Sequence, residues 1–144
     1  MLKYVRGYFK HIIPYQYTLI IELTDCTHNC DKCKNPSRKT EDGQLLNKEI
    51  IDIALSSFKR YIESICFVGG ENHQAELKEL CKHVHTHKLD TCLVTQQQDF
   101  STINKNLIDE LDYIIVGRCD EEGTLLKKDY CSFAETYDWL EVNN

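Results

Sequence analysis

Residues 17–33 read Tyr17-Thr-Leu-Ile-Ile-Glu-Leu23-Thr-Asp-Cys26-Thr-His28-Asn-Cys30-Asp-Lys-Cys33. The first seven residues are mostly apolar or β-branched, which is typical of a strand buried in a sheet. A polar segment with three cysteines follows directly. This region therefore predicts a core strand with a cysteine-rich loop at its carboxyl end.

The loop has the spacing Cys26-x3-Cys30-x2-Cys33. Thiolates are soft ligands that suit iron–sulfur centres, and three of them leave one iron of a four-iron cluster open for a substrate or cofactor. An electron-transfer ferredoxin uses four cysteines, and the next one here, Cys66, lies on a predicted strand. The spacing therefore favours a [4Fe–4S] cluster with one open iron.

A structural zinc site is the main alternative for these cysteines. Zinc knuckles and ribbons combine one C-x2-C with a second such pair, or with an H-x3-H, within a short distance. Cys30-x2-Cys33 is the only C-x2-C of the chain, and the His83-x3-His87 pair lies 50 residues further on. Iron–sulfur ligation is thus preferred, and zinc stays as the alternative.

Strand and helix patterns alternate along the chain, which predicts parallel βαβ units. We expect an edge strand at 2–9, further strands at 64–68, 91–95, 112–116 and 139–142, and helices at 47–61, 74–85 and 101–111. A complete eight-unit barrel needs about 250 residues. The 144 residues therefore predict an α/β fold, a partial open (β/α) barrel with four to five parallel strands in one domain, 1–144.

The composition is that of an ordinary globular protein, with 42% hydrophobic and 28% charged residues and a net charge of −6. Mixed charges with an acidic balance argue against nucleic acid or an anionic membrane as the main partner. The apolar runs are only strand-sized, and the first ten residues do not resemble a secretory signal. We therefore expect a cytoplasmic protein whose eight cysteines serve ligation and packing rather than disulfides.

A second motif, Gly69-Gly70-Glu71, ends the strand predicted at 64–68. Paired glycines let a ligand approach the main chain, and the carboxylate can receive an ammonium group. The simpler interpretation is a turn into a helix, where an acid is also favoured. Thr95 ends the next predicted strand, and both strand ends should lie at the edge that carries the cysteine loop.

The cysteine loop resembles that of the radical S-adenosylmethionine superfamily. It is most similar to the anaerobic ribonucleotide reductase activating proteins, which read C-x-H-x-C-x-G-C-x-N. His28 and Asn35 match this pattern, while Lys32 stands where a glycine is usual. Asn72 replaces the usual proline after the glycine motif, and Val116-Gly117-Arg118 replaces the usual Asp-Gly-Lys.

The resemblance implies two cofactors, a [4Fe–4S] cluster and S-adenosylmethionine. It implies a glycyl-radical activase acting through a 5′-deoxyadenosyl radical, with the large subunit of anaerobic ribonucleoside-triphosphate reductase as partner and a flavodoxin-like electron donor. It assigns the metal to Cys26, Cys30 and Cys33. It assigns the contact with the methionine amino group to Gly69, Gly70 and Glu71. We also expect cofactor contacts from His28 and Asn35, which match the loop pattern, and from Thr95, because it lies at a strand end.

Two other classes of function remain open. The chain could be another small radical enzyme, similar to 7-carboxy-7-deazaguanine synthase or to the pyruvate formate-lyase activase. It could also be a non-catalytic interaction module that holds zinc or an iron–sulfur cluster.

The remaining cysteines and histidines favour structural interpretations. Four cysteines lie in or beside predicted strands or on the inward face of a helix and are most simply small core residues: Cys66, Cys81, Cys92 and Cys119. Cys119 and Cys131 do not have the spacing of a second cluster site. His83 and His87 are one helical turn apart, a spacing that could bind a metal. Polar or cationic residues are favoured near the end of a helix without any metal, however, so we interpret His83, His85 and His87 as residues of a helix end.

Overall fold

The structure is a computed structural model that describes residues 1–13, 15–24, 42–95, 101–116, 123–127 and 140–142. Eight strands form one mixed sheet in the order β3-β1-β2-β4-β5-β6-β7-β8. Their bounds are β1 (Lys3–Lys10), β2 (Thr18–Leu23), β3 (Gln44–Leu45), β4 (Ser64–Val68), β5 (Asp90–Thr95), β6 (Tyr113–Val116), β7 (Gly123–Lys127) and β8 (Leu140–Val142).

The centre of the sheet is parallel. β2, β4, β5 and β6 pair side by side in this orientation, which confirms the predicted parallel core. Antiparallel strands flank it, β1 and β3 on one side and β7 and β8 on the other. β1 is not the edge strand that its sequence suggested, because β3 pairs with its outer side. β7 was not predicted at all.

Three α-helices lie in the described part of the chain, α2 (Lys48–Phe58), α3 (Gln74–Thr86) and α5 (Lys105–Ile108). Asn47 caps α2 by accepting a hydrogen bond from the backbone of Ile50 at 3.0 Å, as an amide at this position usually does. Short 3-10 turns, η1 (Lys59–Tyr61) and η2 (Glu71–His73), follow α2 and precede α3.

α5 is much shorter than the helix predicted over 101–111. Asn104 has extended backbone angles, so the helix begins only after it and ends four residues later. The helical spacing of apolar residues nevertheless identified the inward side correctly, since Ile103, Leu107, Ile108 and Leu111 are all buried. Burial thus follows the sequence pattern even where the backbone is not helical.

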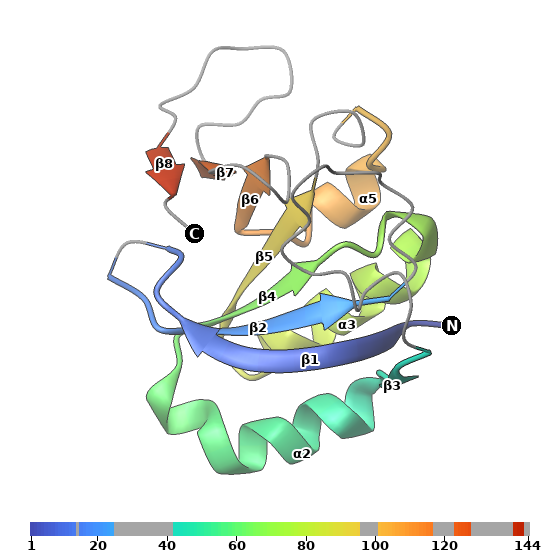
Figure 1. The fold of residues 1–144 in the computed structure, drawn as a ribbon, viewed down its shortest axis with the longest axis vertical. Helices are drawn as coiled ribbons and strands as arrows, with labels where there is room; N and C mark the ends of the chain where they lie inside the picture. Colours follow the sequence, from blue (N-terminus) through green and yellow to red (C-terminus); the bar gives the residue numbers. More distant parts are fainter. Residues whose placement is uncertain (14, 25–41, 96–100, 117–122, 128–139, 143–144) are drawn as a thin grey trace.

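All three α-helices cover the same face of the sheet (Figure 1). One large core joins buried residues of α2, α3 and α5 to the residues of the parallel strands that face them, such as Ile21, Phe67 and Leu93. A smaller cluster, which includes Ile20, Cys66 and Cys92, lies on the opposite face. The crossovers are therefore one-sided, which differs from a doubly wound sheet with helices on both faces.

A helix that crosses a bilayer needs about 20 consecutive, mostly apolar residues. Among the described helices, none is long and apolar enough to cross a membrane.

A buried ion pair lies near the end of β2, on the face that the helices do not cover. Glu22 is 0% exposed and pairs with Arg6 of β1, whose Nη2 lies 2.8 Å from Oε2. Arg6 Nε also donates to Oε2 at 2.9 Å, and the hydroxyl of Tyr8 donates to Oε1 at 3.0 Å. Burial and the Glu22 carboxylate together raise the pKa of Tyr8 well above its usual value, so this hydroxyl stays a donor.

We expect Arg6→Ala to destabilise the fold, because it leaves the buried Glu22 carboxylate with only one of its two side-chain partners. Removing one member of a buried pair costs roughly 3–5 kcal/mol, and since Arg6 is itself half exposed we expect about 2–4 kcal/mol. Urea unfolding at neutral pH measures this difference. Arg60→Ala, which changes a surface arginine of η1, is the control and should cost less than about 0.5 kcal/mol. Equal effects of the two substitutions would contradict the assignment.

Candidate functional site

The carboxyl ends of the four parallel strands meet at one edge of the sheet. β2 ends at Leu23, β4 at Val68, β5 at Thr95 and β6 at Val116. Parallel pairing aligns these ends, because Glu22 is level with Val68, and Thr95 with Val116. Ligands of α/β proteins bind beyond the carboxyl ends of parallel strands, so this edge is the place to look for a site.

The glycine motif forms a left-handed turn at the end of β4. Gly69 and Gly70 have φ values of 90° and 93°, in the region that residues with a side chain rarely adopt. The backbone N–H of Gly69 donates to Val94 O at 3.1 Å, which ties the turn to β5. The turn delivers Glu71 to the start of η2 at the edge of the sheet.

Glu71 and Thr95 are hydrogen-bonded to each other. The Thr95 hydroxyl donates to Glu71 Oε1 at 2.8 Å, and Thr95 is only 2% exposed. Glu71 itself is partly exposed, and within the described residues no cation pairs with its carboxylate. The arrangement therefore presents an oriented carboxylate that can accept a positively charged group from outside the chain.

The motif is packed against the end of β2. A Cβ atom at Gly70 would lie 2.8 Å from Leu23 Cδ1 and 3.2 Å from Leu77 Cδ2. Leu23 is the last residue of β2, three positions before Cys26. The turn that carries Glu71 thus touches the end of β2, and a side chain at Gly70 would be strained by the φ of 93° and would have to displace Leu23.

The predicted ligands Cys26, Cys30 and Cys33 lie outside the described residues, as do His28 and Asn35. The described residues that flank this segment are in contact with one another. A Cβ atom at Gly43 would lie 2.6 Å from Thr24 Cγ2 and 2.8 Å from Tyr4 O, and the N–H of Thr24 donates to Lys3 O at 3.0 Å. The cysteine segment therefore leaves and rejoins the described fold at one place, beside the glycine turn.

Glu22 is a polar residue near this edge that the sequence analysis did not single out. It is level with Val68 in the pairing of β2 with β4 and points to the face away from the helices. The sequence did offer one indication of a buried polar contact here, an acidic residue within the otherwise mostly apolar strand predicted at 17–23. Because Arg6 and Tyr8 hold both of its oxygens, Glu22 serves the structure rather than ligand binding.

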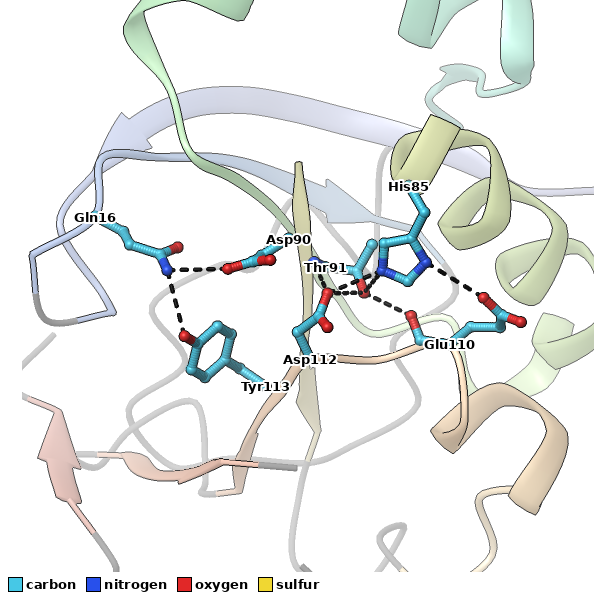
Figure 2. A network of polar contacts seen from close by, with 7 residues as sticks. All are labelled: Gln16, His85, Asp90, Thr91, Glu110, Asp112 and Tyr113. Carbon is cyan, nitrogen blue, oxygen red and sulfur yellow. Dashed lines mark hydrogen bonds and ion pairs between the residues drawn. The ribbon is translucent and has the colours of Figure 1, made fainter. Parts of the chain in front are cut away.

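The opposite edge of the sheet is closed by the protein's own polar groups (Figure 2). Gln16 donates to Asp90 Oδ2 at 3.1 Å and to the Tyr113 hydroxyl at 3.3 Å, which links the amino ends of β5 and β6. His85 lies between Asp112 and Glu110, at 2.9 and 3.3 Å. These hydrogen bonds and ion pairs stabilise this edge, although Gln16 Oε1 is buried there without a hydrogen-bond partner among the described residues.

Cys66, Cys81 and Cys92 are free, fully buried cysteines, which confirms that they are core residues. Burial raises the pKa of the Cys81 and Cys92 thiols, so both remain protonated and unreactive. Cys119 and Cys131 lie outside the described residues, as do Gly117 and Arg118.

Comparison with known proteins gives one match. The model of a family described as "4Fe-4S single cluster domain" matches residues 17–132, which include the cysteine segment and the four parallel strands. No curated protein matches, and no solved structure matches. The match supports an iron–sulfur cluster rather than zinc as the group held by this chain, as the cysteine spacing predicts.

We expect the three core cysteines to resist alkylation in the native protein, because their side chains are buried away from the reagent. Treatment with iodoacetamide at mildly alkaline pH should leave Cys66, Cys81 and Cys92 unmodified, as peptide mass spectrometry would show. The same treatment in guanidinium chloride is the control and should label all three. Labelling of any of them in the folded protein at the rate of a small-molecule thiol would contradict their placement.

Proposed function

Because the chain belongs to the 4Fe-4S single cluster domain family, we propose that it is a radical S-adenosylmethionine enzyme that activates anaerobic ribonucleoside-triphosphate reductase. One observation carries the proposal. The oriented Glu71 carboxylate, the glycine turn and Leu23, the last residue of β2 before the cysteine segment, lie together at one edge of the sheet. This is the arrangement that a cofactor with a cationic amino group and an iron–sulfur partner requires.

The chain supplies residues of the right chemistry for both cofactors. Cys26, Cys30 and Cys33 provide three thiolates, which hold three irons of a cluster and leave the fourth open. When bound together, the cluster and S-adenosylmethionine supply a 5′-deoxyadenosyl radical, which is chemistry that no side chain can perform.

The described residues fit the amino-acid part of S-adenosylmethionine. Glu71 can accept hydrogen bonds from its ammonium group, and the Thr95 hydroxyl holds Glu71 Oε1 in place at 2.8 Å. Gly69 and Gly70 bring the main chain to the same edge without side chains in the way. His28 and Asn35 are proposed to lie close to the cofactor because they follow the activase pattern.

The fold supports the same proposal. Four parallel strands with every crossover helix on one face have the layering of a (β/α) barrel, in which helices surround the strands. We therefore interpret the sheet as a partial open barrel of the radical S-adenosylmethionine type. A short barrel cannot surround a small substrate on all sides, but its open side can receive a loop of a large partner.

We propose two partners, on the resemblance of the cysteine loop to the activating proteins. The glycine-bearing segment of the reductase large subunit would enter the open side and lose a Cα hydrogen there. A flavodoxin-like protein would deliver the electron that each turnover requires.

The test is an anaerobic assay of the reconstituted protein with a purified anaerobic ribonucleoside-triphosphate reductase. We expect four irons and four sulfides per chain by elemental analysis, since the cluster is cubane-type. On reduction we expect 5′-deoxyadenosine by chromatography and a glycyl radical on the reductase by electron paramagnetic resonance.

Cys30→Ala is the control for this assay and should abolish both products, because it removes one cluster ligand. Turnover of a small substrate without any partner protein would exclude the activase role and favour an enzyme similar to 7-carboxy-7-deazaguanine synthase. One zinc per chain and no 5′-deoxyadenosine would exclude the radical enzyme altogether.

We expect Glu71→Ala to raise the KM for S-adenosylmethionine by roughly 10–100-fold, because a hydrogen bond to a charged group contributes about 1.5–3 kcal/mol. Thr95→Val, which removes only the hydroxyl that orients Glu71, should have a smaller effect in the same direction. Steady-state production of 5′-deoxyadenosine measures both.

Glu79→Ala is the matched control, since Glu79 is an exposed carboxylate on α3 away from the strand ends. It should leave KM unchanged. An equal effect of Glu71→Ala and Glu79→Ala, with unaltered melting temperatures, would show that Glu71 does not bind the cofactor.

A further inference from the structure

Three potential metal ligands converge between α2 and α3. The Nε2 atom of His83 lies 2.6 Å from Asp52 Oδ1, and the Nε2 atom of His87 lies 2.9 Å from the same oxygen. One ligand atom from each residue lies within 4.8 Å of the other two. Within the described residues, a single carboxylate oxygen is thus shared by two imidazole rings.

The two helices place these side chains by their packing. Residues four apart on a helix lie on the same face, so His83 and His87 project side by side from α3. Asp52 follows Ile51, which is buried in the core that α2 and α3 share. Packing in the core therefore holds both helix backbones in place, and the three side chains meet on the outer side of the contact between the helices.

The cluster is open to solvent on one side. The side chains of His83 and His87 are 21% and 26% exposed, while that of Asp52 is 50% exposed. An ion could enter past the carboxylate, and the two rings, being half buried, have limited freedom to move away. The histidine rings lie nearly perpendicular to each other, with centroids 5.3 Å apart, so their Nε2 atoms approach Asp52 from different directions.

His85 shows that this convergence is not a general property of the histidines on α3. It lies on a different side of the helix, because two residues correspond to about 200° of rotation. Its two ring nitrogens contact Glu110 and Asp112, in the network at the amino ends of the strands (Figure 2). His85 therefore serves the sheet, and only the pair one turn apart faces Asp52.

The donor set selects a class of metal. Two imidazole nitrogens and one carboxylate oxygen suit zinc and its neighbours, whereas magnesium and calcium prefer oxygen ligands throughout. Three protein ligands leave one position of a tetrahedral ion for water. Zinc with bonds of about 2.0–2.1 Å keeps its ligand atoms roughly 3.3 Å apart. Asp52 Oδ1, now 2.6 and 2.9 Å from the two nitrogens, has to withdraw by about 0.4–0.7 Å to reach this separation, which its half-exposed side chain allows.

We propose that Asp52, His83 and His87 form a zinc site that joins α2 to α3. The site is separate from the strand-end edge that carries Glu71. His83 lies nine residues beyond the first residue of α3, which is roughly 13 Å along the helix axis. Its three ligands from the described residues supply nitrogen and oxygen, which distinguishes its zinc from zinc bound adventitiously by the thiolates of the cysteine segment.

Zinc bound in this way stabilises the folded protein, since the unfolded chain does not hold the three ligands together. The histidine pair and Asp52 come from different helices, so their convergence is lost on unfolding. The melting temperature of the protein should therefore rise when zinc is added.

The test uses the cluster-loaded protein under anaerobic conditions, so that iron occupies the cysteine segment. After dialysis against micromolar zinc chloride, we expect one zinc per chain by inductively coupled plasma mass spectrometry. X-ray absorption at the zinc edge should show nitrogen and oxygen ligands, with the outer-shell scattering of two imidazoles. His87→Ala and Asp52→Ala should each lose the bound zinc and the associated rise in melting temperature.

His85→Gln is the matched control, because it changes a histidine of the same helix that does not face Asp52. It should keep its zinc. Circular dichroism shows whether each variant is folded, and Asp52→Ala, a change at a half-exposed side chain, keeps the test valid should His87→Ala unfold the protein. Sulfur ligands in the spectrum, full zinc content in Asp52→Ala, or no zinc in the wild type would each overturn the proposal.

Discussion

Parallel pairing of β2, β4, β5 and β6 is the constraint on which the rest of the structure depends. Because each strand runs in the same direction, every crossover must return to the opposite edge, and the segments that follow the strands all gather at one edge. Glu71 and Thr95 are 24 residues apart in the chain, yet they meet at 2.8 Å because they end neighbouring parallel strands. The same pairing brings the end of β2, which the cysteine segment follows in the sequence, to that edge.

The two edges of this sheet differ in how their polar groups are satisfied. At the amino ends, carboxylates such as Asp90 and Asp112 have partners from Gln16, His85 and Thr91 (Figure 2). At the carboxyl ends, the only described partner of the Glu71 side chain is a neutral hydroxyl. Because Glu71 is partly exposed at the edge where ligands of α/β proteins bind, its carboxylate is available to a cationic group.

Local patterns in the sequence predicted the local parts of this fold. β4 begins and ends as predicted, because Ser64–Val68 is a short apolar run bounded by polar residues and glycines. The length of α5 was predicted wrongly. The spacing of apolar residues indicates which side chains are buried, and a turn can bury the same residues as a helix. The pair of Arg6 with Glu22 could not be predicted, because it depends on the register of β1 against β2. His83 and His87 were visible as a pair, but Asp52 joins them only through the packing of α2 on α3.

α3 connects the two proposed sites physically. Its first turn follows directly on Glu71 and η2, and its last turns carry His83 and His87. Leu77, on the same helix, packs against the position of Gly70, so the orientation of α3 fixes the base of the glycine turn. A metal that joins α3 to α2 would restrain the far end of the helix on which this turn rests. Because core packing resists small displacements, restraint at one end of a rigid helix limits movement at the other. In the proposed zinc-bound protein the Glu71 carboxylate is therefore held more closely in the position in which Thr95 orients it.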